Sequence, residues 1–272
     1  MFAVRALTAA VLLAALFAAV WLLDRNVFAV VVAAIVALGA REWARAAGFA
    51  VRPALAYAVF CTAAFGACVA GLQPLQPASM PLAAVWLVAL VFWAAVVPAW
   101  LLRGLSPAAG RVLLAAGVVV LVPSALAMVA LRPDALLALL ALVWIADTAA
   151  YLVGRACGRR KLAPAISPGK TWEGVAGGTL ASLAYAIILV FWWPALGQRV
   201  TGALWLAYVA GVVILCATSI LGDLFESALK RRAGVKDSGS LLPGHGGVLD
   251  RIDSATAVLP VGALLLACIE AT

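Results

Sequence analysis

Nine apolar runs, each long enough to cross a lipid bilayer, dominate this sequence of 272 residues. A helix needs about 20 apolar residues to span a hydrocarbon core of roughly 30 Å. Charged residues make up only 11% of the chain, whereas they approach about a quarter of a soluble globular domain. We therefore expect an integral membrane protein. The runs lie near residues 5–23, 27–47, 54–72, 82–102, 111–130, 135–153, 174–194, 203–225 and 250–270.

The apolar runs are expected to be helices, so the predicted fold class is all-α with about nine transmembrane helices. Lipid offers no hydrogen-bond partners to an exposed backbone, and the runs lack the alternation of apolar and polar residues that is typical of a β-barrel. The first run follows Arg5, as the core of a signal peptide would. Because its apolar stretch of about 17 residues exceeds the usual length of such a core, we expect a retained span.

The positions of lysine and arginine predict that the N-terminus lies in the cytoplasm and the C-terminus outside. Short cytoplasmic loops are enriched in these residues, and this threading leaves only Arg25, Arg132 and Arg199 outside. The net charge of +8 then lies mainly on one face, next to anionic lipid headgroups, and does not indicate nucleic-acid binding. The residues placed on the cytoplasmic side are Arg5, Arg41, Arg45, Arg52, Arg103, Arg111, Arg155, Arg159, Arg160, Lys161, Lys170, Lys230, Arg231, Arg232, Lys236 and Arg251.

Acidic residues within the runs are concentrated in the second half of the chain. We predict a scaffold of transmembrane helices over residues 1–130, which offers a surface for dimerisation or lipid entry, and a catalytic transmembrane region over residues 131–272. A carboxylate at membrane depth is costly, so it usually faces a cavity, a partner or an ion. The acids at or near the predicted cytoplasmic ends of the later helices are Asp147, Glu173, Asp223, Glu226, Asp250 and Asp253.

The first polar cluster begins at the end of the sixth run and continues into a basic loop. Asp147 and Tyr151 are four residues apart and share a helix face, and Glu173 opens the next helix. A basic loop on this side can serve as a topology signal alone. The compact turn predicted at 167–171 is more specific, because Lys170 lies beside hydroxyl residues and a glycine amide, a combination that suits a phosphate.

The second cluster closes the eighth run. Asp223, Glu226, Ser227 and Lys230 fall at positions i, i+3, i+4 and i+7 and form one polar stripe on an otherwise apolar helix. Glu226 and Lys230 can form a purely structural ion pair. Asp223 lies one to two turns inside the run and has no cation at i+3 or i+4, so it is the stronger candidate for a functional group.

The third cluster is a glycine-rich stretch, 236–254, that leads into the ninth run. Asp250 and Asp253 project from one face at the N-terminal end of this helix. An acid in a first turn is commonly a cap that complements the helix dipole. Two acids on one face, together with Asp223, better suit a hard cation such as magnesium, which takes one or two carboxylates and completes its octahedron with water and substrate phosphates.

Within the same stretch, His245 is the only histidine of the chain. A lone histidine is more often a structural hydrogen-bonding group than a catalyst. It is flanked by Gly244, Gly246 and Gly247, which allow the backbone to approach a ligand closely. The residues alone thus indicate a divalent ion, a basic rim and a phosphorylated or nucleotide substrate that meets a lipid at the membrane surface.

The polar stretches resemble the phosphatidate cytidylyltransferase (CDP-diacylglycerol synthase) family. The run Ser227-x2-Lys230-Arg231-x4-Lys236-Asp237-x-Gly239-x2-Leu242-Pro243-x-His245-Gly246-Gly247-x2-Asp250-Arg251-x-Asp253 matches the family signature at every defined position. The segments LAPAISPGKTWEG and GDLFES are also similar to that family. This motif similarity covers residues 144–254, and so long a pattern with fixed spacing is far more specific than a short motif.

The resemblance implies an enzyme of phospholipid biosynthesis that uses CTP and phosphatidate to form CDP-diacylglycerol and pyrophosphate and that requires magnesium. We expect Asp223 and Asp250 to hold the metal, with Asp253 as a further ligand or a support for the ligands. Lys170, Lys230, Arg231 and Lys236 would neutralise phosphate charge. Among these residues, those predicted to be catalytic are Asp223, Asp250, Lys230 and Lys236. The predicted substrate-binding residues are Lys170, Ser227, Arg231, Asp237, His245, Gly246, Gly247 and Arg251.

The resemblance also implies a homodimer and a second cation such as potassium. The bias of lysine and arginine places the active site on the cytoplasmic side. The richness in alanine and arginine indicates a bacterium with a GC-rich genome, so we expect the cytoplasmic (inner) membrane. Two other functions stay open at this point. A related lipid nucleotidyltransferase or a CTP-using lipid kinase would share such a site, and a kinase would release CDP in place of pyrophosphate. A cation-coupled transporter would use Asp147, Asp223 and Asp250 as an ion path, although the outer halves of the runs carry no polar counterpart.

Overall fold

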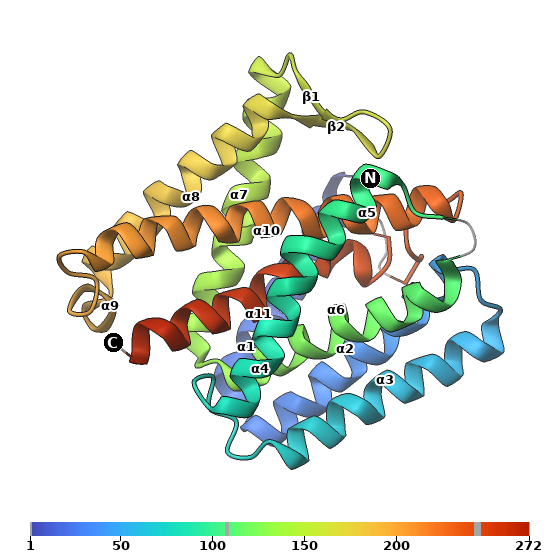
Figure 1. Ribbon diagram of the computed structural model, residues 1–272, viewed down its shortest axis with the longest axis horizontal. Coiled ribbons are helices and arrows are strands. Elements are labelled where there is room, and N and C mark those ends of the chain that lie inside the picture. The colour runs from blue at the N-terminus through green and yellow to red at the C-terminus, as the bar shows by residue number, and fades with distance from the viewer. Residues whose placement is uncertain (1, 107–108, 242–245, 272) are drawn as a thin grey trace.

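The structure, a computed structural model, describes residues 2–106, 109–241 and 246–271. For residues 2–6 and 270–271 it describes only the backbone. Helices make up nearly all of the structure, with one small hairpin between two of them (Figure 1). The elements are α1 (Phe2–Leu22), α2 (Arg25–Ala46), α3 (Val51–Gly71), α4 (Met80–Val91), the π-helical turn η1 (Phe92–Val96), α5 (Val97–Arg103), α6 (Gly110–Ala130), α7 (Pro133–Cys157), β1 (Lys161–Ala163), β2 (Ser167–Thr171), α8 (Trp172–Trp192), α9 (Pro194–Gly197), α10 (Leu204–Arg232) and α11 (Leu249–Ala271).

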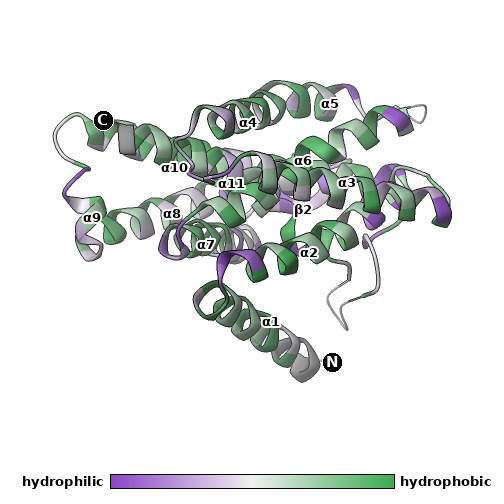
Figure 2. Cartoon of the chain, turned by 90° about the horizontal axis from the view of Figure 1, so that it is seen from below, coloured by the Kyte–Doolittle hydropathy of each residue, from purple (hydrophilic) through white to green (hydrophobic). Residues whose placement is uncertain are grey.

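The prediction of an all-α integral membrane protein is confirmed. In the described part of the chain, eight helical segments are long and apolar enough to cross a membrane, with α4, η1 and α5 forming one of them, Met80–Arg103. The first predicted span corresponds to α1, whose described side chains form a shorter apolar helix, Leu7–Leu22. Figure 2 shows hydrophobic residues over most of the helices and hydrophilic ones gathered mainly at helix ends and in connections.

Long-range hydrogen bonds gather the loops at two ends of the bundle. At one end, the Arg232 guanidinium donates to the carbonyl oxygens of Ser106 and Ala46, at 3.1 and 3.5 Å. At the other end, Arg25 donates to the carbonyl oxygens of Leu75 and Ala130, at 3.3 and 3.4 Å. Loops that the sequence assigns to one side of the membrane therefore lie together.

Small residues allow α7 and α8 to pack closely, side by side (Figure 1). A Cβ atom on Gly174 would lie 2.7 Å from the Ala150 carbonyl oxygen, and one on Gly178 would lie 2.7 Å from the Ala146 carbonyl oxygen. Small residues at four-residue spacing are typical of closely packed transmembrane helices. The Thr171 hydroxyl accepts from the Gly174 amide and caps the start of α8.

The turn predicted at 167–171 is wrong in detail, because these residues form strand β2. It pairs with β1 in an antiparallel hairpin that joins α7 to α8, with Lys161 opposite Thr171 and Ala163 opposite Ser167. The tight turn lies earlier, where the Ile166 amide donates to the Ala163 carbonyl. Pro168 and Gly169 are both of a residue type that is common in turns, but here they lie in a strand.

Helices α10 and α11 connect the second half of the chain to the first. They pack against each other, where a Cβ atom on Gly222 would lie 2.6 Å from the Asp253 carbonyl oxygen, and α11 also packs against α4 and α6. Phe225 of α10 is fully buried in an aromatic cluster formed by Trp43, Phe92, Trp93 and Trp100. The division at residue 130 into scaffold and catalytic region stays a prediction about roles.

Candidate active site

A cavity of about 790 Å³ lies where α7, α8, β2, α10 and α11 meet. Its size falls in the range of pockets that hold small molecules and cofactors. Most of the predicted site residues line it, although they come from three separate stretches of sequence. These are Lys170, Asp223, Ser227, Lys230, Arg231, Lys236, Asp237, Asp250, Arg251 and Asp253. Gly246 and Gly247 are outside the lining, and the predicted ligand contact of His245 falls on a residue outside the described part.

Asp223 is paired with a cation from another element. Its Oδ2 lies 2.7 Å from the Lys170 Nζ of β2, and its Oδ1 accepts from the Ser227 hydroxyl at 3.2 Å. The Lys170 and Asp223 side chains are 24% and 29% exposed, so both reach the cavity surface. The sequence predicted each residue separately, and the hairpin brings them together.

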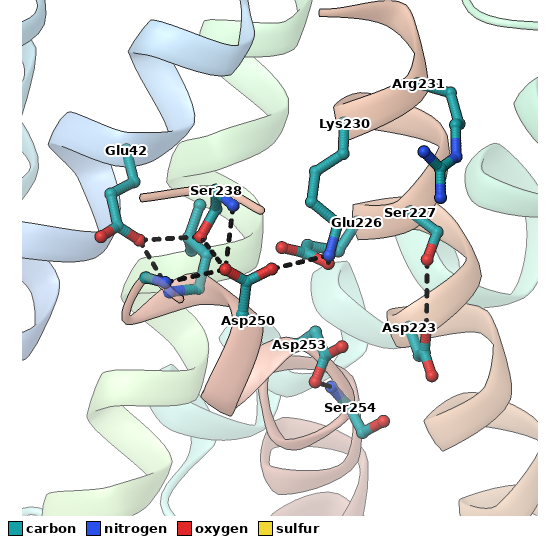
Figure 3. Close-up of polar contacts among 12 residues, drawn as sticks. Glu42, Asp223, Glu226, Ser227, Lys230, Arg231, Ser238, Asp250, Asp253 and Ser254 are labelled. Atoms are coloured by element: carbon teal, nitrogen blue, oxygen red, sulfur yellow. Dashed lines mark hydrogen bonds and ion pairs between the residues drawn. The ribbon is translucent and has the colours of Figure 1, made fainter. Parts of the chain in front are cut away.

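Lys230 holds two buried carboxylates at once. Its Nζ lies 2.5 Å from the Glu226 Oε2, one helical turn away, and 2.7 Å from the Asp250 Oδ1 of α11 (Figure 3). Both acids are 5% exposed and the lysine is 13% exposed. The ion pair that the spacing allowed between Glu226 and Lys230 is therefore present, and the lysine additionally connects α10 to α11.

Asp250 is surrounded by donors from the chain itself. Its Oδ2 accepts from the Ser238 amide at 2.9 Å, the Ser238 hydroxyl at 2.9 Å and the Gly247 amide at 2.8 Å, and its Oδ1 meets Lys230. A carboxylate has about four lone-pair positions. In this arrangement, Asp250 orders the loop that precedes α11. Gly246, at a φ of 78°, adopts the left-handed conformation that glycine favours.

Two further acids, besides Asp223, are found in the wall of the cavity. Asp147 and Asp253 line it together with Asp223. The one hydrogen bond described for the Asp253 carboxylate comes from the Ser254 amide, at 2.8 Å. No three acidic, histidine or cysteine side chains in the described ranges already stand close enough to enclose a metal ion. The oxygen donors nevertheless suit a hard cation that keeps most of its water and takes only one or two carboxylates.

The rim of the cavity is basic and is tied to the hairpin. The Arg231 Nε donates to the Ile166 carbonyl at 3.3 Å, which joins the end of α10 to the hairpin turn. The Glu173 carboxylate, in the first turn of α8, accepts from the backbone amides of Arg159 and Arg160, at 3.0 and 3.1 Å. These contacts hold a cationic loop beside a cavity whose size suits a nucleotide.

Glu42 of α2 is a site-related residue that sequence reasoning missed. Its carboxylate accepts hydrogen bonds from the Ser238 hydroxyl and from the amides of Val248 and Leu249 (Figure 3). The signal was an acid near the end of an otherwise apolar run, in the segment AREWARA. Neighbouring arginines made it look like part of an ordinary charged helix end.

The chain is similar to known proteins over most of its length. The Cytidylyltransferase family matches residues 3–269. The phosphatidate cytidylyltransferase of Pseudomonas aeruginosa is 42% identical over 271 residues, which cover 96% of this chain and 96% of that protein. A shorter match to the protein of the same name from Haemophilus influenzae is 54% identical over 122 residues, 44% of this chain and 41% of that protein. The one from Bacillus subtilis is 46% identical over 128 residues, 46% of this chain and 44% of that protein.

Proposed function

This chain belongs to the cytidylyltransferase family, and on that premise we propose that it transfers the cytidylyl group of CTP to phosphatidate, forming CDP-diacylglycerol and pyrophosphate. The observation that carries the proposal is a cavity at the end of a membrane-spanning bundle, where ten residues of the family signature and its neighbours converge. A lipid substrate and a nucleotide can meet only at such a boundary between membrane and water.

The chemistry is an in-line displacement at phosphorus. A phosphatidate oxygen attacks the α-phosphorus of CTP, a new P–O bond forms, and the bond from the α-phosphorus to the oxygen bridging to the β-phosphorus breaks. The electron pair of the broken bond leaves with pyrophosphate. Because the phosphatidate phosphate is already largely ionised near neutral pH, attack needs no strong general base. Positioning and charge neutralisation are then the main sources of rate enhancement.

The cations of the cavity supply that neutralisation. Lys170 and Arg231 stand on opposite elements, β2 and the end of α10, and would contact phosphate groups of the two substrates. Lys236 and Arg251 are exposed at the entrance and would attract anionic substrates. Lys230 is engaged by two acids, so it would act mainly by holding Asp250 and its loop in place.

The carboxylates of the cavity would hold magnesium, which supplies charge neutralisation on the triphosphate when it is bound. Asp253 has the more open carboxylate, since the one hydrogen bond described for it comes from the Ser254 amide. Asp223 would reach a metal through an oxygen that now meets Lys170 or Ser227. Asp250 would reach a metal through its Oδ1, the oxygen that Lys230 now occupies. A potassium ion as a second cation is part of the same proposal and rests on the surplus of carboxylates.

The protein is an integral membrane protein, and we place it in the cytoplasmic membrane of a bacterium with the cavity facing the cytoplasm. Support comes from the excess of lysine and arginine at the end of the bundle that carries the cavity, and from the supply of CTP on that side. A homodimer, with contacts through the first helices, completes the proposal.

Product analysis of purified protein in detergent tests the function. The protein is supplied with labelled CTP and phosphatidate, once with magnesium and once with excess chelator. We expect labelled CDP-diacylglycerol and pyrophosphate only with magnesium. Labelled CDP without labelled lipid would instead indicate a kinase or a hydrolase. Equal turnover in the chelator would overturn the metal requirement while leaving the transfer reaction in place.

A further inference from the structure

Glu42 lies in α2, far along the sequence from the loop and helix that it contacts. Its Oε1 accepts from the Val248 amide at 3.1 Å, and its Oε2 accepts from the Leu249 amide at 2.9 Å and the Ser238 hydroxyl at 3.0 Å. The partners are 196 to 207 residues away along the chain. A side chain of the predicted scaffold is thus built into the junction between the signature loop and α11.

The bonds to Glu42 satisfy backbone groups that the helix itself leaves without partners. Leu249 is the first residue of α11 and Val248 precedes it, and amides at a helix start have no acceptor within the helix. A negative charge is also favourable at this end of the helix dipole. Glu42 therefore performs, from another helix, the task that an N-cap side chain usually performs locally.

The loop backbone packs directly against the Glu42 carboxylate. A Cβ atom on Gly239 would lie 2.5 Å from Oε1, and one on Gly247 would lie 2.5 Å from Oε2. Any side chain at either position would displace the carboxylate or the loop. Two glycines of the glycine-rich stretch are thus explained by contact with this acid.

Ser238 connects Glu42 to Asp250. Its hydroxyl lies within hydrogen-bond distance of the Glu42 Oε2 and the Asp250 Oδ2, at 3.0 and 2.9 Å, and its amide donates to the same Asp250 oxygen. A hydroxyl has one hydrogen to donate, so the two carboxylates share it. Since Asp250 also meets Lys230, a continuous polar chain runs from α2 through the loop to α11 and α10 (Figure 3).

We propose that Glu42 is a positioning residue for cytidylyl transfer, which fixes the junction of the signature loop with α11 and, through Ser238, the direction of the Asp250 carboxylate. The reaction in this inference rests on the proposed function, whereas the geometry rests on the contacts described above. Glu42 is outside the cavity lining, so its effect would pass through Asp250 and Lys230 and not through the substrates.

The test compares Glu42→Gln with the unchanged protein in two measurements on the full chain in detergent. Glutamine keeps the size of the side chain but offers one acceptor oxygen where glutamate offers two, so at least one amide or hydroxyl loses its partner. Hydrogen exchange, followed by mass spectrometry, should become faster in peptides that contain Ser238, Val248 and Leu249. The kcat with saturating CTP and phosphatidate should fall about 10- to 100-fold, as for other groups that orient functional carboxylates.

Two further variants separate positioning from general damage. Asp24→Ala is the matched control, because it removes the cap at the distant end of α2, where the Asp24 Oδ1 accepts from the amides of Asn26 and Val27, at 3.0 and 3.1 Å. We expect this variant to have a thermal unfolding midpoint similar to that of Glu42→Gln. Its kcat should nevertheless equal that of the unchanged protein. Glu42→Asp retains two acceptor oxygens and should recover part of the lost kcat.

The other possible results each contradict one part of the proposal. Unchanged exchange in the three peptides would remove the anchoring role, and faster exchange with an unchanged kcat would remove the positioning role. A kcat loss that matches a lower unfolding midpoint, without recovery in Glu42→Asp, would make Glu42 a merely structural residue. If the unchanged protein forms no CDP-diacylglycerol, the proposed function fails, whereas faster exchange in Glu42→Gln would still support the anchor.

Discussion

The Asp223 carboxylate faces a cavity and is held there by one cation and one hydroxyl, from Lys170 and Ser227. Asparagine has almost the same shape but carries no charge and only one acceptor oxygen. We expect Asp223→Asn to lose at least about 100-fold in kcat/KM, the order of loss that follows removal of a group stabilising transition-state charge. Formation of CDP-diacylglycerol by the purified variant is the measurement.

The matched control for Asp223→Asn is Asp134→Asn. Asp134 also forms an ion pair, at 3.0 Å with Arg132, but the arginine side chain is 75% exposed and the pair stands at the far end of α7. Exposed pairs of this kind contribute little to stability. Asp134→Asn should keep normal activity, and an active Asp223→Asn enzyme would remove Asp223 from the site.

Lys230 is the cation that pairs with two carboxylates, those of Glu226 and Asp250, which are each 5% exposed. Lys230→Met would leave both without their cation, which typically costs about 3–5 kcal/mol for a buried pair. The midpoint of heat-induced unfolding in detergent should fall clearly. The double variant Lys230→Met with Glu226→Leu removes one of the stranded charges and should recover part of the loss. A single variant as stable as the unchanged protein would show that water reaches these acids freely.

Local patterns in the sequence found many of the charged residues of the cavity but not the partners that come from other elements. The i, i+3, i+4, i+7 stripe predicted Asp223 and Lys230, and the first turn of α11 predicted Asp250. The pairing of Lys170 with Asp223 joins residues from different elements, and Glu42 reaches residues about 200 positions away. Helix periodicity defines faces but contains no information on which faces meet.

At the level of elements, the contact between α7 and α8 sets one wall of the cavity. Gly178 and Gly174 line the cavity and touch the α7 backbone closely. In Gly178→Ala, the added methyl group would lie 2.7 Å from the Ala146 carbonyl oxygen and would push the two helices apart. Overpacking of this kind costs about 1–3 kcal/mol, so the unfolding midpoint and the activity should both fall.

Gly66→Ala is the matched control for that change. Gly66 lies in α3, and a Cβ atom there would meet nothing within 4 Å. Because alanine is the better helix former, this variant should be as stable as the unchanged protein or slightly more so. If Gly178→Ala and Gly66→Ala had the same unfolding midpoint and the same activity, α7 and α8 would tolerate being moved apart.

The hairpin between α7 and α8 shows where element prediction from sequence failed. Apolar composition predicted most of the spans to within a few residues, because a span is long and its composition is distinctive. The helix α10 is an exception, since it continues past the predicted end at residue 225 to Arg232. The strands β1 and β2 are three and five residues long, too short for a repeating pattern. Glu173 and Arg231 contact the base and the turn of the hairpin from outside it, and local sequence does not reveal such contacts.

At the scale of the whole molecule, the distribution of charge predicts which end of the bundle faces the cytoplasm. Hydrogen bonds of Arg232 gather three loops at one end, and those of Arg25 gather three at the other. These bonds group the loops but do not say which group lies inside. The lysine and arginine excess assigns the Arg232 end to the cytoplasm.

Labelling of single cysteines by a membrane-impermeant maleimide in intact spheroplasts tests this orientation. Cys157 is exposed at the end of α7 and would be kept alone after replacement of the other cysteines. Thr201→Cys, at an exposed loop position before α10, would be placed in a chain without other cysteines. We expect Thr201→Cys to react from outside and Cys157 to react only after the membrane is permeabilised. The reverse result would place the cavity outside, away from CTP, and would contradict the proposed reaction together with the orientation.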